Sequence, residues 1–227
     1  MTGRWIHGTL LAVGFVALAW AVFSLPVPTA GLAAEAQGSL DRTGVTNPVT
    51  AVLLNYRAYD TLLEVAVLLL AIVAVWSLRR AEVGTASAPV SPMLWVLLRV
   101  LLPLLVLTGA YLLWIGAFAP GGAFQGGALI GGAIVLLLLG GWRYRLTARR
   151  EGWLRAGLGI GLTVFAVVGL GVMFSGGRLL EFPVAQAGGW ILVIETAAMI
   201  SIGLTLGALF LGGRPDEKSP IEPEARS

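Results

Sequence analysis

The stretch GGWILVIETAAMISIGLTLGALFL, residues 188–211, decides the fold of this chain. Its one ionisable residue, Glu195, stands among apolar and small residues. About 20 predominantly apolar residues are enough for a helix to cross the hydrocarbon core of a bilayer. Because backbone groups in lipid must be hydrogen-bonded within the segment, the helix is the favoured structure. The stretch therefore predicts a transmembrane helix.

Five further runs share this character. Each is nearly free of charge and is bounded by segments that are polar or rich in glycine and proline. The second run carries Glu64 and the third carries Arg99. Together with residues 188–211 they predict an all-α, polytopic membrane protein with about six transmembrane helices. The five runs cover residues 6–25, 61–78, 93–118, 126–142 and 156–174.

The composition agrees with a membrane protein. Of 227 residues, 57% are hydrophobic and 12% are charged, whereas a soluble domain carries about 25% charged residues. The chain has no cysteine and one histidine, His7. Disulfides, thiol catalysis and cysteine-bound clusters are therefore excluded, and a histidine metal site within this chain is not expected. Since the sequence contains no cofactor motif, we expect neither a cofactor nor a bound metal.

The basic residues predict the orientation in the membrane. If the N-terminus is cytoplasmic and six spans alternate, Arg42, Arg57 and Arg178 fall outside. Eleven basic residues then fall inside, which is the asymmetry that the positive-inside rule predicts. We expect both termini in the cytoplasm and no nucleic-acid partner. The eleven are Arg4, Arg79, Arg80, Arg143, Arg145, Arg149, Arg150, Arg155, Arg214, Lys218 and Arg226.

The first run allows an alternative interpretation. Arg4, the apolar stretch and Ala34-Glu35-Ala36 together resemble a signal peptide with its cleavage site. The run is longer than the usual signal core of about 7–15 residues, which favours a retained helix. For the segment from Pro26 to Pro48 we expect an extracytoplasmic loop with little core. For residues 213–227 we expect a disordered cytoplasmic tail.

Three charged residues precede or enter the second span. Arg57, Asp60 and Glu64 are spaced by three and four residues, which places them along one face of a helix. Carboxylates at such a position can exchange protons or coordinate sodium through their oxygens. The alternative is an interfacial ion pair that fixes the end of the helix. The sequence leaves both possibilities open.

A glycine-rich break separates the third and fourth spans. Glycine and proline interrupt regular helix and allow close approach of backbones. A re-entrant turn would present backbone carbonyls and the Gln125 amide to a cavity. A tight helix hairpin is the alternative. The candidate residues of this loop are Pro120, Gly121, Gly122, Phe124, Gln125, Gly126 and Gly127.

Two more charged residues lie inside predicted spans. Glu195 should face protein or water, because a carboxylate at the bilayer centre costs about 2.5–3.5 kcal/mol. Arg99 lies nearer the cytoplasmic end and can extend its guanidinium to the interface, or pair with a carboxylate of a neighbouring subunit. Glycines spaced by four also predict close helix packing. These pairs stand at 127 and 131, 157 and 161, and 203 and 207.

Two stretches resemble known families. Residues 47–64, NPVTAVLLNYRAYDTLLE, resemble the terminal MbhE-like module of Mrp-type antiporters (the C-terminal part of the MrpA subunit) and of membrane-bound hydrogenases. Residues 94–211 look like the MnhB/MrpB subunit, whose Pro-Gly-Gly-Gly-Phe-x-Gly-Gly motif corresponds to Pro120–Gly127. The chain departs from these patterns at Ala58 and Ala123, where glycine is usual. It also departs at Ala117, where histidine is usual.

The resemblance implies a fusion of two modules. Residues 1–82 would hold two helices and the long loop, and residues 91–212 would hold four helices. It further implies an accessory subunit of a multisubunit sodium/proton antiporter, or of a related complex-I-like ion-translocating complex. Asp60, Glu64 and Glu195 would then belong to the ion path with Gln125, and Arg57 would tune them.

The implied partners are large antiporter-like subunits, the lipid bilayer, sodium ions and protons. The implied location is the bacterial inner membrane. The predicted spans hold too few ionisable residues for a complete relay, which is a second reason to expect partner subunits. An enzyme is not expected, because no nucleophile–base pair is apparent. The alternative function is a scaffold whose carboxylates make interhelix pairs without transporting ions.

Overall fold

The computed structural model describes residues 2–24, 33–78, 91–141, 151–174 and 179–212. Within these ranges the chain is helical and contains no strand. Residues 79–90 and 142–150, which cover most of the expected cytoplasmic connections, lie outside them, as do Arg178 and the predicted tail.

Every predicted span corresponds to a helix. Four helices, α4, α5, α7 and α8, are long and apolar enough to cross a membrane. The helix α6 and the described part of α1 are apolar but shorter. The expected all-α, multi-pass membrane architecture is therefore confirmed. The bounds are α1 (Thr2–Ser24), α4 (Ala58–Leu78), α5 (Pro92–Ile115), α6 (Ala123–Leu139), α7 (Glu151–Phe174) and α8 (Val184–Phe210).

The chain divides into two compact units, residues 1–35 and residues 36–227. In the first unit, α1 is a long apolar helix whose described side chains are almost all exposed. Phe23 and Trp20, for example, are 88% and 77% exposed. Large exposed apolar surfaces require cover by lipid or by another protein, so α1 has the properties of a membrane helix without a core of its own.

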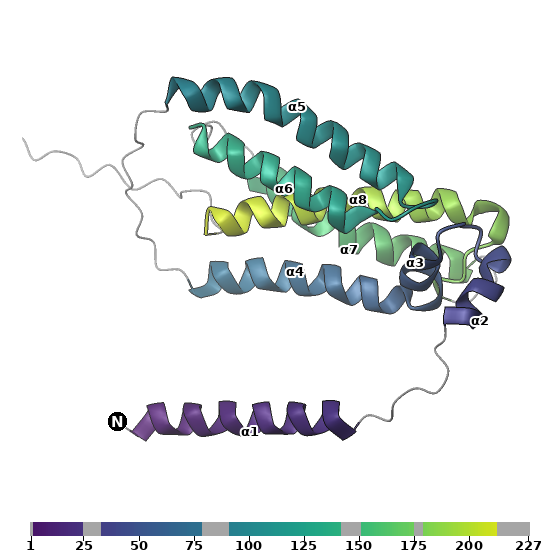
Figure 1. The fold of residues 1–227 in the computed structure, drawn as a ribbon, viewed down its shortest axis with the longest axis horizontal. Coiled ribbons are helices and arrows are strands. Elements are labelled where there is room, and N and C mark those ends of the chain that lie inside the picture. The colour runs from purple at the N-terminus through teal and green to yellow at the C-terminus, as the bar shows by residue number, and fades with distance from the viewer. Residues whose placement is uncertain (1, 25–32, 79–90, 142–150, 175–178, 213–227) are drawn as a thin grey trace, which may run out of the picture. The chain divides into compact units, whose positions relative to one another are not determined.

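The second unit is built around α8. This helix packs against α6 and α7 and also contacts α4 and α5, as Figure 1 shows. In its most apolar stretch 61% is buried, compared with 17% in α4 and in α5. A helix that is apolar on all sides is suited to such a central position. The core of this unit therefore follows α8 along its length.

Small residues allow the helices around α8 to approach closely. A Cβ atom built at Gly127 or Gly131 would lie 2.8 Å from a side-chain carbon of α8. The contact is reciprocal, because isoleucines of α6 fill the positions of the α8 glycines. On the α7 side, Gly161 faces Ser201 and Gly157 faces Leu204, which confirms the predicted close packing. The facing pairs of α6 and α8 are Gly127 and Ile202, Ile130 and Gly203, Gly131 and Leu206, and Ile134 and Gly207.

The segment before α4 corrects one expectation. It contains α2 (Ala33–Gly38), the 3-10 turn η1 (Leu40–Arg42), α3 (Pro48–Ala51) and the π-helical turn η2 (Val52–Tyr56). These elements are short, and the expectation of little core for the loop is wrong for its last part.

That last part, residues 43–47, is a short irregular stretch that packs into the core. Thr43, Val45 and Asn47 are buried, whereas Gly44 and Thr46 between them are exposed. Val45 belongs to a core cluster that includes residues of α7 and α8. Gly44 has a φ of 70°, and a side chain there would clash with the Val184 carbonyl at the start of α8. The small residues that suggested a loose loop are what allow this backbone to lie so close.

Candidate functional site

Glu195 lies in the middle of the core with its carboxylate against the start of α6. Its side chain is 7% exposed, and it accepts a hydrogen bond from the backbone N–H of Ala123. A Cβ atom built at Gly122 would lie 2.6 Å from Glu195 Oε1. The first amides of a helix have no partner within it, and a negative charge near them is stabilising. Glu195 therefore caps α6 from a neighbouring helix.

The turn between α5 and α6 depends on its glycines. Gly122 has a φ of 108°, a backbone conformation that favours glycine. Its N–H donates to the Leu112 carbonyl at 2.8 Å, so the chain folds back on the last turn of α5. A side chain at Gly121 would clash with the same carbonyl. Of the two predicted structures for the loop, the tight hairpin is the one that forms.

The remaining loop residues divide between the surface and the core. Pro120 and Gln125 are exposed. Gln125 Oε1 lies 3.8 Å from the Cβ atom built at Gly122, so the amide and Glu195 flank this glycine. Gly126 and Gly127 are buried against α8. Phe124 packs beside the buried cluster that joins α4, α6 and α8.

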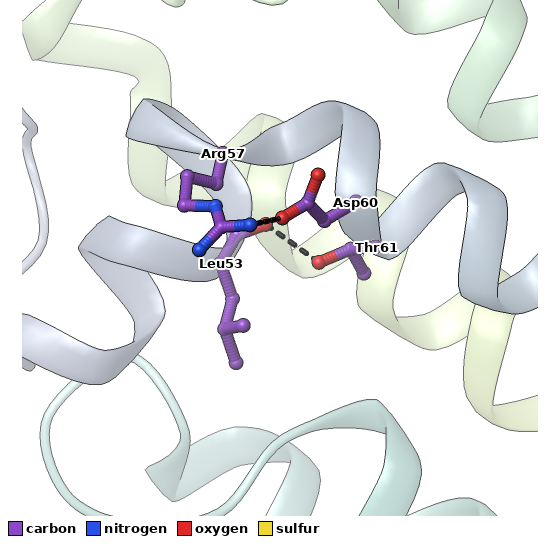
Figure 2. A network of polar contacts seen from close by, with 4 residues as sticks. All are labelled: Leu53, Arg57, Asp60 and Thr61. Carbon is purple, nitrogen blue, oxygen red and sulfur yellow. Dashed lines mark hydrogen bonds and ion pairs between the residues drawn. The ribbon is translucent and has the colours of Figure 1, made fainter. Parts of the chain in front are cut away.

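Arg57 and Asp60 form an ion pair where η2 meets α4, as Figure 2 shows. Both are well exposed, at 69% and 45% of their side chains. Beside them, the Thr61 hydroxyl donates to the Leu53 carbonyl at 2.6 Å. The Arg57 N–H also donates to the Val52 carbonyl at 2.8 Å. These bonds close the break between the two helical segments. The ion pair considered from the sequence is present, and its place at a membrane interface stays a prediction.

Glu64 lies on the outer surface of α4. Its side chain is exposed, and the described part of the chain gives its carboxylate no ion pair or hydrogen bond. The next residue, Val65, is buried in a cluster with Ala123 and Ala198. The structure thus brings Glu195, Gly122 and Gln125 together but leaves Glu64 facing outward.

Arg99 is also exposed, on α5. Its two predicted roles, an interfacial position and a pair with another subunit, stay predictions. Among the described residues, no group of three or more histidine, cysteine or carboxylate side chains is arranged to hold a metal ion.

Sequence reasoning missed Asn47. Its side chain is 4% exposed, and Nδ2 donates to the carbonyls of Gly116 at 2.9 Å and Ala119 at 2.8 Å. Its Oδ1 accepts from the Val49 N–H at 3.1 Å and caps α3. The order Asn-Pro predicts such a cap. Nothing local in the sequence indicates the bonds to the α5–α6 turn.

Comparison with known proteins gives a family and one curated relative. A family model described as a domain related to the MnhB subunit of Na+/H+ antiporter matches residues 93–212. The relative is a probable K(+)/H(+) antiporter subunit of Rhizobium meliloti (strain 1021). It is 27% identical over 88% of this chain and 25% of its own length. The chain therefore spans about a quarter of that relative.

Two solved structures share the arrangement of helices. One is a chain of the membrane-bound sulfane sulfur reductase, an archaeal respiratory membrane complex, with a TM-score of 0.67 and 26% identity. The match covers 92% of this chain and 97% of that one. The other is a chain of the Mrp complex from Dietzia sp. DQ12-45-1b, with a TM-score of 0.66 and 25% identity. That match covers 98% of this chain and 27% of the other.

Proposed function

We propose that this chain is an accessory subunit that contributes to the ion path of a multisubunit cation/proton antiporter or a related respiratory membrane complex. The chain belongs to the family of proteins related to the MnhB subunit of Na+/H+ antiporters. The family match confirms the predicted MnhB/MrpB resemblance. The family is one of transport subunits and not of enzymes. As a multi-pass protein of this family, the chain lies in the membrane, which in bacteria is the inner membrane.

One observation carries the ion-path role. Glu64 is exposed on a helix long and apolar enough to cross a membrane, and no described residue pairs with it. A carboxylate in contact with lipid is costly, so such groups face protein or water. We infer that a partner subunit covers this face of α4 and that the two together line a hydrated path. Asp60, one turn nearer the start of α4, would lie at the mouth of this hydrated path.

The relatives support partners of a particular kind. Their names describe an antiporter subunit, an Mrp complex and a respiratory membrane complex. We propose large antiporter-like subunits as partners, with sodium or another monovalent cation and protons as the transported ions. The MbhE-like interpretation of residues 1–82 stays a prediction, because the family match begins at residue 93.

A second candidate function is an assembly scaffold. The observation that favours it is the Glu195 carboxylate, which caps α6 and so has a structural task within the chain. In this reading Glu195 fixes the core of the unit, and the transported ion never reaches it.

Carboxylate-to-amide variants distinguish the two functions. The complete complex would be expressed in a host that lacks sodium extrusion, and dye-reported antiport would be measured in membrane vesicles. For a path residue, Glu64→Gln should lower the rate at least about tenfold at unchanged complex content. The matched control Glu35→Gln, at an exposed carboxylate outside the predicted spans, should leave the rate unchanged.

Two results would contradict the proposal. Normal transport by Glu64→Gln and Glu195→Gln in an intact complex would favour the scaffold. Robust antiport from this chain expressed alone would show that it is not an accessory subunit.

A further inference from the structure

We propose that Asn47 is a positioning residue, whose side-chain amide holds the α5–α6 turn so that the Ala123 N–H meets the Glu195 carboxylate. The functional half of this inference rests on the proposed function and on the ion-path role that the family resemblance implies for Glu195. Whether Asn47 holds the conformation of the α5–α6 turn can be measured separately from transport.

The first step is the contact between Asn47 and the turn. Asn47 Nδ2 reaches the carbonyls of Gly116 and Ala119, which lie 69 and 72 residues further along the chain. The backbone N–H of Asn47 donates to the Ala117 carbonyl at 3.1 Å, and that of Thr46 to the same oxygen at 3.3 Å. The Thr50 hydroxyl donates to the Gly116 carbonyl at 2.5 Å. Residues 46–50 are thus bonded to the start of the turn at Gly116, Ala117 and Ala119.

The carbonyls of the α5–α6 turn need the donors that Asn47 supplies. The helix α5 ends at Ile115, so the carbonyls of Gly116 and Ala119 lie past it in the turn and need donors from outside the helix. A buried carbonyl left without a donor is destabilising. Asn47 supplies donors on either side of Ala117, and it does so from a side chain that is itself buried. Without the Asn47 amide, the Gly116 carbonyl keeps the Thr50 hydroxyl as a donor, whereas the Ala119 carbonyl loses the side-chain donor that bonds it, and the turn should depart from its present conformation there.

The third step connects the turn to Glu195. Four residues after Ala119, the Ala123 N–H donates to the Glu195 carboxylate. Between them, Gly122 is held by its bond to Leu112 and leaves no room for a side chain beside Glu195. Hydrogen bonds weaken steeply when they are misaligned. A displaced turn would therefore remove the Ala123 amide from the carboxylate, although Asn47 itself never touches Glu195.

The test uses Asn47→Asp in the complete complex. The aspartate keeps the oxygen that caps α3, since aspartate and asparagine are equally good caps, but it loses both donors to the turn. The matched control is Asn55→Asp, because Asn55 lies in the same segment and donates at 3.1 Å to Thr43 instead of the turn. Asn47→Ser removes the amide NH2 without adding charge and leaves a shorter side chain whose hydroxyl can still cap α3, and it decides the matter if Asn47→Asp fails to assemble.

The first readout is hydrogen–deuterium exchange of peptides that cover residues 116–127. We expect exchange about tenfold faster in Asn47→Asp than in the wild type, in line with the loss of buried hydrogen bonds. The control should match the wild type. Unchanged exchange in the Asn47 variants, or equal acceleration in Asn55→Asp, would overturn the positioning role.

The second readout is transport in a double-mutant cycle with Glu195→Gln. If Asn47 acts through Glu195, Asn47→Asp lowers the antiport rate on its own but adds nothing in the Glu195→Gln background. Additive losses, or a loss that only follows complex content, would overturn that link. If Glu195→Gln transports at the wild-type rate, the proposed path role of Glu195 fails, and the exchange result still decides whether Asn47 holds the turn.

Discussion

The helices α8 and α4 are both long enough to cross a membrane and each carries one glutamate within its apolar stretch, yet they use it in opposite ways. Glu195 of α8 is buried and bonded to Ala123, whereas Glu64 of α4 is exposed. Mean hydropathy does not follow burial, because it is 1.9 for the more buried helix α8 and 2.4 for the more exposed helix α4. The more apolar helix is the more exposed one, because the surroundings of a membrane protein are themselves apolar.

This difference separates two kinds of membrane carboxylate. Inside the bundle, a carboxylate can be satisfied by a helix start, and small residues bring that start within reach. On the outer face, no group of the described residues pairs with Glu64, and under the proposed function a partner subunit covers it. If the two carboxylates differ as the structure shows, substitutions around Glu195 should affect folding, whereas substitutions around Glu64 should affect contacts with other subunits.

The largest effect should follow Gly122→Ala. The backbone at a φ of 108° costs an alanine about 1–3 kcal/mol, and the new methyl group would meet the Glu195 carboxylate. We expect loss of folded chain, measured by size-exclusion chromatography in detergent. Gly132→Ala in α6 is the control, because a Cβ there meets nothing within 4 Å. Equal yields of the two variants would show that folding does not depend on the close contact between Gly122 and Glu195.

A smaller effect should separate Glu195→Ala from Glu64→Ala. Removal of Glu195 leaves the buried Ala123 amide without its acceptor, at a cost of about 1–3 kcal/mol. Removal of Glu64 from the surface of the chain should change stability by less than about 0.5 kcal/mol. Thermal unfolding of the purified chain in detergent measures both. If Glu64→Ala were the more destabilising, Glu64 would have a partner within the chain.

Ser201→Ala should have a lesser effect, although the residue is buried. The Ser201 hydroxyl donates to the Leu158 carbonyl of α7 at 2.5 Å, and interhelical hydrogen bonds in membrane proteins contribute about 0.6 kcal/mol on average. Thr163→Ala is the control, because its hydroxyl bonds within its own helix. The same unfolding measurement applies. A loss above about 2 kcal/mol, beyond the range for such bonds, would show that the α7–α8 contact depends on this bond.

The proposed protein partner on the exposed face of α4 around Glu64 can be tested without disturbing the fold. A photo-crosslinking residue at Val67, which is 60% exposed and one turn beyond Glu64, should yield an adduct with another subunit of the complex. Placed at Ile72, which is fully buried, the same residue should crosslink within the chain. Gel mobility and mass spectrometry identify the products. An adduct of Val67 with lipid alone would argue against a protein partner on this face.

Much of the fold could be predicted from the sequence, because membrane helices have a strong local signal. The apolar runs located each of the long apolar helices, and the run at residues 156–174 ended at the residue where α7 ends. Glycines spaced by four correctly indicated the contacts of α6 and α7 with α8. The glycine-rich stretch Pro120–Gly127 was correctly placed at a break between helices, since its backbone requirements are local.

The site could be predicted only in part, because its partners are distant in the sequence. Spacing placed Arg57 beside Asp60, and the cost of a carboxylate in lipid indicated that Glu195 faces protein or water, but nothing in the sequence indicated that Glu64 faces outward. The acceptor of the Ala123 amide and the acceptors of the Asn47 amide lie about 70 residues away. The loop at Thr43–Asn47 was misjudged for the same reason, since its core is supplied by α7 and α8.

The interlocking glycines and isoleucines of α6 and α8 have a further consequence for register. Gly127 and Gly131 receive side chains of α8, while Gly203 and Gly207 receive isoleucines of α6. A shift of either helix by one residue would turn its contacts by about 100° and set branched side chains against one another. The contacts of the two helices therefore fit in one register. Contacts spread along several turns fix the height at which the first amide of one helix stands beside the carboxylate of the other.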